Sequence, residues 1–142
     1  MFQIQPIRSR ELQQQIAEAL GTAYLPDTYA FFAGELSEDS TTITSLIALC
    51  QFTFGPEKSV IRSLAYPPAA EGDEALKILI RTVMYAVYRG EIHTFVFADG
   101  VAEPAFMRSL GFRERDGEWS LDLVKFYESP CHFQPDEKKD GE

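Results

Sequence analysis

The sequence is poor in the residues that most often build metal centres. Its 142 residues include only two cysteines and two histidines. Cys50 and Cys131 lie far apart in the chain, and a reducing compartment would leave both as thiols. Cys131 and His132 form one adjacent pair, but no second pair stands at the spacing that a tetrahedral site needs. We therefore expect no metal site.

Long apolar runs are missing as well. No stretch approaches the roughly 20 apolar residues that a membrane helix needs. The first ten residues, MFQIQPIRSR, lack the basic flank and the long apolar core of a signal peptide. These two absences predict a cytoplasmic protein with no membrane partner.

Basic residues are few. Lysine and arginine number 13 against 22 acidic residues, which gives a net charge of −9. Such a chain repels phosphate backbones, and no basic stripe interleaved with aromatic residues appears. These features exclude a general nucleic-acid-binding protein.

The remaining composition is that of a soluble globular protein, with 45% hydrophobic and 25% charged residues. The length suffices for one domain with a real core, which we place at residues 1–133. Residues 134–142 are charged and contain proline and glycine, a composition typical of a disordered tail.

The first third of the chain predicts a strand, a helix and an ambiguous segment. Residues 2–7 alternate apolar and polar side chains, which indicates a strand. Ser9 can then cap a helix whose apolar residues recur every four positions and which Gly21 ends. Residues 26–36 fit either a helix that starts at Pro26 or a strand over 29–36, and we favour the strand.

The middle and the end of the chain predict further strands and two helices. Residues 42–54 and 59–66 are rich in β-branched and aromatic types and indicate a hairpin around the turn 55–58. An apolar stripe over 73–89 predicts the strongest helix. The later elements are a strand over 91–98, a short helix between Pro104 and Gly111, and an alternating strand over 117–126. This order predicts a mixed α/β sheet with helices on both faces.

Several side chains suit the core of such a sheet. Cys50 lies in a β-rich run, which favours a buried and inert thiol over a nucleophile. Arg62 either points inward, where it would suit an acidic group, or is a plain edge residue. Five aromatic residues are predicted to fill the core rather than form a stacking surface: Tyr29, Phe31, Phe32, Phe52 and Phe54.

The segment Phe106–Phe112, FMRSLGF, carries a family resemblance. It is similar to the "tyrosine, two residues, leucine-glycine-phenylalanine" ending of the GCN5-related N-acetyltransferases (GNAT), which closes their last core helix before a final hairpin. The order of elements over residues 2–127 also resembles that family. The resemblance implies an α/β (α+β) fold with a mostly antiparallel sheet, in which the strands 59–66 and 91–98 form a central, splayed parallel pair.

The same resemblance implies a reaction and a cofactor site. The family transfers an acetyl group from acetyl-coenzyme A (acetyl-CoA) to an amine. The pantetheine arm lies between the splayed strands, and the pyrophosphate lies on backbone amides at the start of the central helix, where the helix dipole favours an anion. By motif position, the cofactor-binding residues are Leu64, Ala65, Gly72, Asp73, Glu74 and Ala75.

The loop before that helix departs from the family pattern. The family loop reads glutamine or arginine, two residues, glycine, one residue, then glycine or alanine. Here Ala70 replaces the polar residue, Asp73 replaces the first glycine, and only Ala75 fits. Alternatively Gly72 takes the glycine role with the register moved by one. In either register, acids at 71, 73 and 74 would face a pyrophosphate with like charge.

The catalytic groups are less well marked. Many family members carry a tyrosine that protonates the leaving thiolate at the position of Met107, and a thioether has no proton to give. His93 would suit a general base near neutral pH, and Glu57 or Glu91 could activate an amine through water. Each also has a plainer interpretation, as a sheet-face histidine or a solvated carboxylate.

Two functions follow from these observations. The first is an N-acetyltransferase that acts on a small-molecule or protein amine. The alternative is a catalytically degenerate relative that has lost acetyl-CoA binding and serves as a small-ligand or protein-interaction module. A homodimer through the last strands is compatible with either function.

Overall fold

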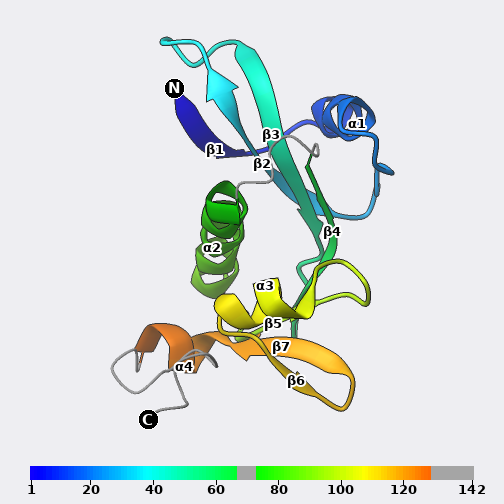
Figure 1. Cartoon of the computed structure of the whole chain (residues 1–142), viewed down its shortest axis with the longest axis vertical. Coiled ribbons are helices and arrows are strands. Elements are labelled where there is room, and N and C mark those ends of the chain that lie inside the picture. The colour runs from blue at the N-terminus through cyan, green and yellow to red at the C-terminus, as the bar shows by residue number, and fades with distance from the viewer. Residues whose placement is uncertain (67–72, 129–142) are drawn as a thin grey trace.

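The computed structural model of the protein describes residues 1–66 and 73–128 (Figure 1). The predicted tail over 134–142 and the loop residue Gly72 lie outside the described residues. The elements in chain order are β1 (Phe2–Pro6), α1 (Arg10–Ala19), β2 (Tyr29–Leu36), β3 (Ile43–Phe52), β4 (Ser59–Ala65), α2 (Asp73–Arg89), β5 (Thr94–Phe97), α3 (Pro104–Ser109), β6 (Arg113–Arg115), β7 (Glu118–Asp122) and α4 (Leu123–Glu128).

The strands form one seven-stranded sheet in the order β1-β2-β3-β4-β5-β7-β6. Every neighbouring pair is antiparallel except β4 and β5, which run parallel. The mixed, mostly antiparallel sheet with one parallel pair is thus confirmed. The ambiguous segment is a strand, as favoured, because β2 pairs with β1 on one side and with β3 on the other.

Helices cover both faces of the sheet, as the order of elements predicts. In Figure 1, α1 and α2 lie on opposite sides of β2, β3 and β4. Side chains of β2 alternate between these faces. Phe32 packs in one cluster with Ile16 of α1, whereas Ala33 packs in another with Leu79 and Val83 of α2.

The two long helices begin and end at sequence signals. The Ser9 hydroxyl accepts a hydrogen bond from the backbone N–H of Leu12 at 3.2 Å, which caps α1. Gly21 follows that helix with a φ of 75°, a left-handed conformation that glycine adopts without strain. Helix α2 has the predicted bounds, and its apolar stripe is buried against the sheet.

The predicted strand over 117–126 is wrong at its end. Strand β7 stops at Asp122, and α4 begins at Leu123. The Asp122 carboxylate accepts hydrogen bonds from the backbone N–H groups of Val124 at 3.0 Å and Lys125 at 3.2 Å, so it caps the new helix. Leu123 is buried, as a strand residue at that position of the alternation would be. The apolar pattern therefore continued into the helix and gave the wrong strand end.

The final hairpin that the resemblance implies is present. Strands β6 and β7 pair antiparallel around Asp116 and Gly117, both of which have positive φ, at 54° and 81°. An Asp-Gly pair with two positive φ angles is the favoured two-residue hairpin turn, because its twist matches that of the strands.

The prediction that all five aromatic residues fill the core is partly wrong. Phe32 and Phe52 are buried, but Tyr29 is 61% exposed and Phe54 is 40% exposed. Tyr29 begins β2 and Phe54 follows β3, so both stand at the end of the sheet where fewer neighbouring strands cover them.

Candidate functional site

The parallel strands β4 and β5 separate halfway along β4. Pairing runs from Ser59 opposite Phe95 to Ile61 opposite Phe97, and the backbone N–H of Ala98 donates to the Ile61 carbonyl at 2.9 Å. Beyond this point β4 continues to Ala65, paired on its other side with β3. Among the described residues, the β5-facing edge of residues 62–65 therefore has no strand partner.

A β-bulge marks the place where the strands diverge. Phe52 of β3 pairs with Ile61, but Gln51 pairs with Ser63, so Arg62 is an extra residue in β4. A bulge bends its strand and increases the local twist. The bulge thus turns the end of β4 away from β5, and it leaves Arg62 exposed, as the edge-residue interpretation predicts.

A cavity of about 330 Å³ lies beside the diverging end of β4. Its walls come from the end of β4, the first turns of α2, the segment after β5, and α3. The lining residues are Leu64, Tyr66, Leu76, Lys77, Val101, Ala102, Glu103, Ala105, Phe106 and Ser109. We call this cavity the cofactor cleft, after the position that the resemblance implies for acetyl-CoA.

Lys77 brings a positive charge to the cofactor cleft that motif matching missed. It is half-buried and lies one turn into α2, four residues after Asp73. Residues four apart share a helix face, so a cation at this position faces the same side as the helix start. Together with the dipole of the first turn, Lys77 makes this end of the cleft suitable for an anion.

Of the residues predicted to hold the cofactor, some line the cofactor cleft and others do not. Leu64 lines the cleft, and Ala65 is the half-buried last residue of β4. Asp73 is the first residue of α2, and Glu74 and Ala75 follow it without lining the cleft, Glu74 being exposed and Ala75 half-buried.

Met107 lies in the core rather than in the cleft. Only 5% of it is exposed, and it belongs to the cluster that contains Leu110 and Phe112. Phe106, the preceding residue, lines the cleft instead. The phenol that does line the cleft is Tyr66, at the end of β4, which the family motif gave no reason to select.

The carboxylate and histidine candidates lie away from the cleft. Glu57 is exposed in the turn between β3 and β4, and His93 is exposed directly before β5. Both therefore stand where the parallel strands begin, whereas the cleft lies beyond the end of their pairing. The four residues of β5 alone span about 13 Å. Glu91, in the turn before β5, is also exposed.

Two other predicted features concern Cys50 and metal ions. Cys50 is fully buried in β3, and desolvation raises the pKa of its thiol far above the ordinary value, so the nucleophilic thiolate is disfavoured. Within residues 1–66 and 73–128, no three histidine, cysteine or acidic side chains gather as a metal would require. In the same residues, no helix combines the length and apolar character of a membrane crossing.

No protein-family model and no curated protein sequence matches the chain. Solved structures do match its fold. The ribosomal-protein-S18-alanine N-acetyltransferase from Escherichia coli has a TM-score of 0.65 at 14% identity, over 87% of this chain and 94% of that chain. The spermidine/spermine N-acetyltransferase SpeG from Vibrio cholerae also has a TM-score of 0.65, at 10% identity, over 91% and 99% of the two chains.

A third solved structure contains the coenzyme itself. The NatC complex bound to Gag peptide and coenzyme A (CoA) has a TM-score of 0.61 at 15% identity, over 84% of this chain and 94% of that chain. TM-scores of 0.61 to 0.65 establish a shared fold, and the element order, the parallel strand pair and the final hairpin agree with it. The chain therefore has the fold of the GCN5-related N-acetyltransferases.

Proposed function

We propose that this protein is an N-acetyltransferase that transfers the acetyl group of acetyl-CoA to an amine. The observation that carries the proposal is the cofactor cleft, which opens where β4 leaves β5 and ends at Lys77 near the start of α2. The names of two structural neighbours, an alanine and a spermidine N-acetyltransferase, support an amine acceptor.

The residues of the cleft fit the cofactor. Leu64, Ala102 and Phe106 offer apolar contacts for the pantetheine arm. The unpaired edge of residues 62–65 offers backbone N–H and C=O groups to the amides of that arm, much as an added strand would. Lys77 and the first amides of α2 suit the phosphates.

When bound, acetyl-CoA supplies an acetyl group activated as a thioester. The acceptor nitrogen forms a bond to the acetyl carbon, the bond between that carbon and sulfur breaks, and the proton lost by the amine is balanced by the proton gained at sulfur. The contribution of this chain to such a transfer is mainly to hold and orient the reactants.

We assign the proton donor to Tyr66. Among the described residues that line the cleft, hydroxyl groups belong to Tyr66 and Ser109, and the Ser109 hydroxyl already donates to the Phe106 carbonyl at 2.7 Å. The Tyr66 hydroxyl makes no hydrogen bond to a described residue, so its proton is available. Buried Met107 has none to give.

Glu103 supports a cationic acceptor. It occupies the N-cap position of α3, but its side chain makes no capping hydrogen bond and lines the cleft. A solvated carboxylate at this rim, in a chain with a net charge of −9, attracts protonated amines and repels acidic acceptors.

The alternative is a protein of the same fold that no longer uses acetyl-CoA. The burial of Met107 at the position of the usual acid favours it, as do the acidic residues that precede and begin α2. Such a protein would keep the cleft for another small ligand or act through its surface.

Calorimetric titration with CoA and acetyl-CoA at moderate salt separates the two. Micromolar binding supports the transferase, and no binding at millimolar ligand overturns it. Lys77→Gln should then weaken CoA binding about tenfold, as loss of a charge-assisted phosphate contact does. Lys125→Gln, an exposed lysine on α4, is the matched control and should leave binding unchanged. Tyr66→Phe should lower turnover of a polyamine or amino-terminal peptide without changing the affinity for acetyl-CoA.

A further inference from the structure

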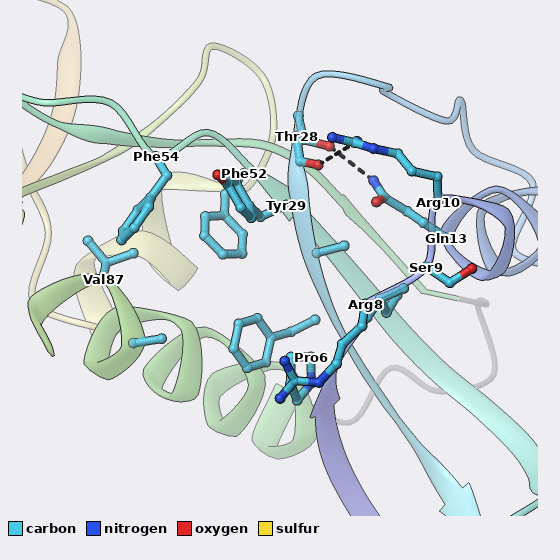
Figure 2. Close-up of a pocket in the computed structure, with 14 residues that line it drawn as sticks. Pro6, Arg8, Ser9, Arg10, Gln13, Thr28, Tyr29, Phe52, Phe54 and Val87 are labelled. Carbon is cyan, nitrogen blue, oxygen red and sulfur yellow. Dashed lines mark hydrogen bonds between the residues drawn. The ribbon is translucent and has the colours of Figure 1, made fainter. Parts of the chain in front are cut away.

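A second and larger cavity, of about 520 Å³, lies between α2 and the sheet at the opposite end of that helix (Figure 2). Its lining residues are Pro6, Ile7, Arg8, Ser9, Arg10, Gln13, Thr28, Tyr29, Ala30, Phe31, Phe52, Phe54, Ala86 and Val87. We call it the aromatic pocket. It contacts α2 ten residues after the cofactor cleft does, which is about 15 Å along the helix axis.

The walls of the aromatic pocket are rich in rings that face one another. The ring centroids of Phe31 and Phe52 are 6.0 Å apart, and those of Tyr29 and Phe52 are 6.2 Å apart. Tyr29 and Phe54 meet edge to face at 5.7 Å. The exposed Tyr29 and Phe54 thus stand at the opening, where a further aromatic ring would find both faces and edges to contact.

The position of Phe54 depends on a glycine. A Cβ atom added at Gly90, directly after α2, would overlap the end of the Phe54 ring. Gly90 therefore lets this ring pack over the end of α2 and form one wall of the pocket.

Among the described residues that line the pocket, the charged ones are both positive. They are Arg8 and Arg10, and none is acidic, although acids outnumber bases 22 to 13 in the chain. The Arg10 guanidinium donates to the backbone carbonyls of Pro26 and Thr28. Arg8 forms no hydrogen bond or ion pair with a described residue, and Figure 2 shows it extended towards Pro6.

The start of α1 adds to this positive potential. The helix begins at Arg10, beside the pocket, and its dipole directs partial positive charge at the same opening. Below it, the buried Gln13 donates to the Thr28 hydroxyl at 3.0 Å and to the Gln51 side-chain oxygen at 2.9 Å, which fixes this wall in place.

We propose that the aromatic pocket binds a small aromatic monocarboxylate. The ring lies among Phe31, Phe52 and Tyr29, and the carboxylate pairs with Arg8. Apolar walls with a few convergent polar groups, at this volume, are typical of small-ligand sites. The proposal does not depend on acetyl transfer, because no residue of the cofactor cleft takes part in it.

Binding is tested by NMR on methyl-labelled protein with 3-phenylpropionate, its neutral analogue 3-phenylpropanamide, and 3-phenylpropylamine. We expect shifts at the Ala30, Ala86 and Val87 methyl groups but not at Leu64 and Val101 of the cofactor cleft. The carboxylate should bind about five- to tenfold more tightly than the amide, as an accessible charge pair allows, and the amine should bind least. Shifts at the cleft with 3-phenylpropionate or its amide, or no shifts at the pocket with millimolar 3-phenylpropionate, would overturn the proposal.

Two variants make the test specific. Arg8→Gln should abolish the preference for carboxylate over amide, whereas Arg115→Gln, an exposed arginine on β6, should retain it and so controls for net charge. Gly90→Ala should displace the Phe54 ring and weaken the carboxylate and the amide alike, with folding checked by circular dichroism. A folded Gly90→Ala protein with unchanged affinities, or a retained preference in Arg8→Gln, would show that the pocket is not the site.

Discussion

Replacing Gln51 of β3 by alanine should destabilise the protein strongly, because this uncharged side chain makes several buried hydrogen bonds. Gln51 is fully buried. Its side-chain oxygen accepts hydrogen bonds from Gln13 at 2.9 Å and from the backbone N–H of Leu25 at 3.0 Å. Its amide donates to the Ala23 carbonyl at 2.9 Å. These three bonds tie α1 and the loop between α1 and β2 to the sheet.

The magnitude follows from those bonds. A typical internal hydrogen bond contributes about 1 kcal/mol net, so the loss of three costs about 3 kcal/mol. Gln13 is buried and Leu25 is half-buried, and the removed side chain leaves a cavity, so we expect a loss of about 3–5 kcal/mol. For a chain of this length, a 3 kcal/mol loss lowers Tm by about 6–12 °C.

Urea unfolding followed by circular dichroism measures this loss as a change in midpoint at constant slope. Gln14→Ala, at an exposed position of α1, is the control and should change stability by less than about 0.5 kcal/mol. Gln13→Ala combined with Gln51→Ala should cost less than the sum of the two, because they share one bond. A loss below about 1 kcal/mol for Gln51→Ala would refute the assigned network.

Three further predictions concern charge and thiol chemistry. Asp73→Gly should tighten CoA binding about threefold to tenfold at low salt and less at high salt, because it removes a negative charge from the first residue of α2. Calorimetry at two salt concentrations that showed unchanged or weaker affinity would contradict this. In a Cys131→Ser variant, Cys50 should resist a thiol reagent until denaturant unfolds the chain, since burial raises the pKa of its thiol, and rapid labelling of the folded protein would contradict its burial. Tyr88 donates a hydrogen bond of 2.5 Å to the Glu128 carboxylate. This bond raises the pKa of the Tyr88 hydroxyl above its ordinary value of about 10. The stability that this proton contributes is therefore present below about pH 10 and lost as the pH rises through the folded-state pKa. Tyr88→Phe should flatten that decline in urea titrations between about pH 8 and pH 11, and an unchanged slope would contradict the assignment.

Local signals accounted for much of the fold. The sequence predicted both ends of α1 from Ser9 and Gly21, because capping depends only on neighbouring residues. The end of the chain was mispredicted because apolar alternation continued through Leu123, while Asp122 supplied an equally local cap for a helix. One signal could have predicted α4. Asp122 is a capping residue, and the apolar residues Phe126 and Tyr127 lie three and four positions after Leu123.

The sequence proposed a place for the candidate site, and the cavity that the structure shows there has a different set of lining residues. The family motif indicated the end of β4 and the start of α2, and the cleft lies there. Motif positions selected Met107, which is buried in the core, and passed over Lys77 and Tyr66, which line the cleft. Side-chain direction on a helix depends on which face the sheet covers, and a motif does not record that.

By itself the sequence determined most of the elements and their order, because propensity, capping and apolar period act over a few residues. Only the tertiary structure decided where β4 leaves β5, since the bulge at Arg62 arises from the register with β3. Only the tertiary structure also gathered Arg8, Phe52 and Val87 around one pocket. These residues come from three separate segments, namely the connection between β1 and α1, strand β3 and helix α2. Long-range packing rather than local preference brings such residues together.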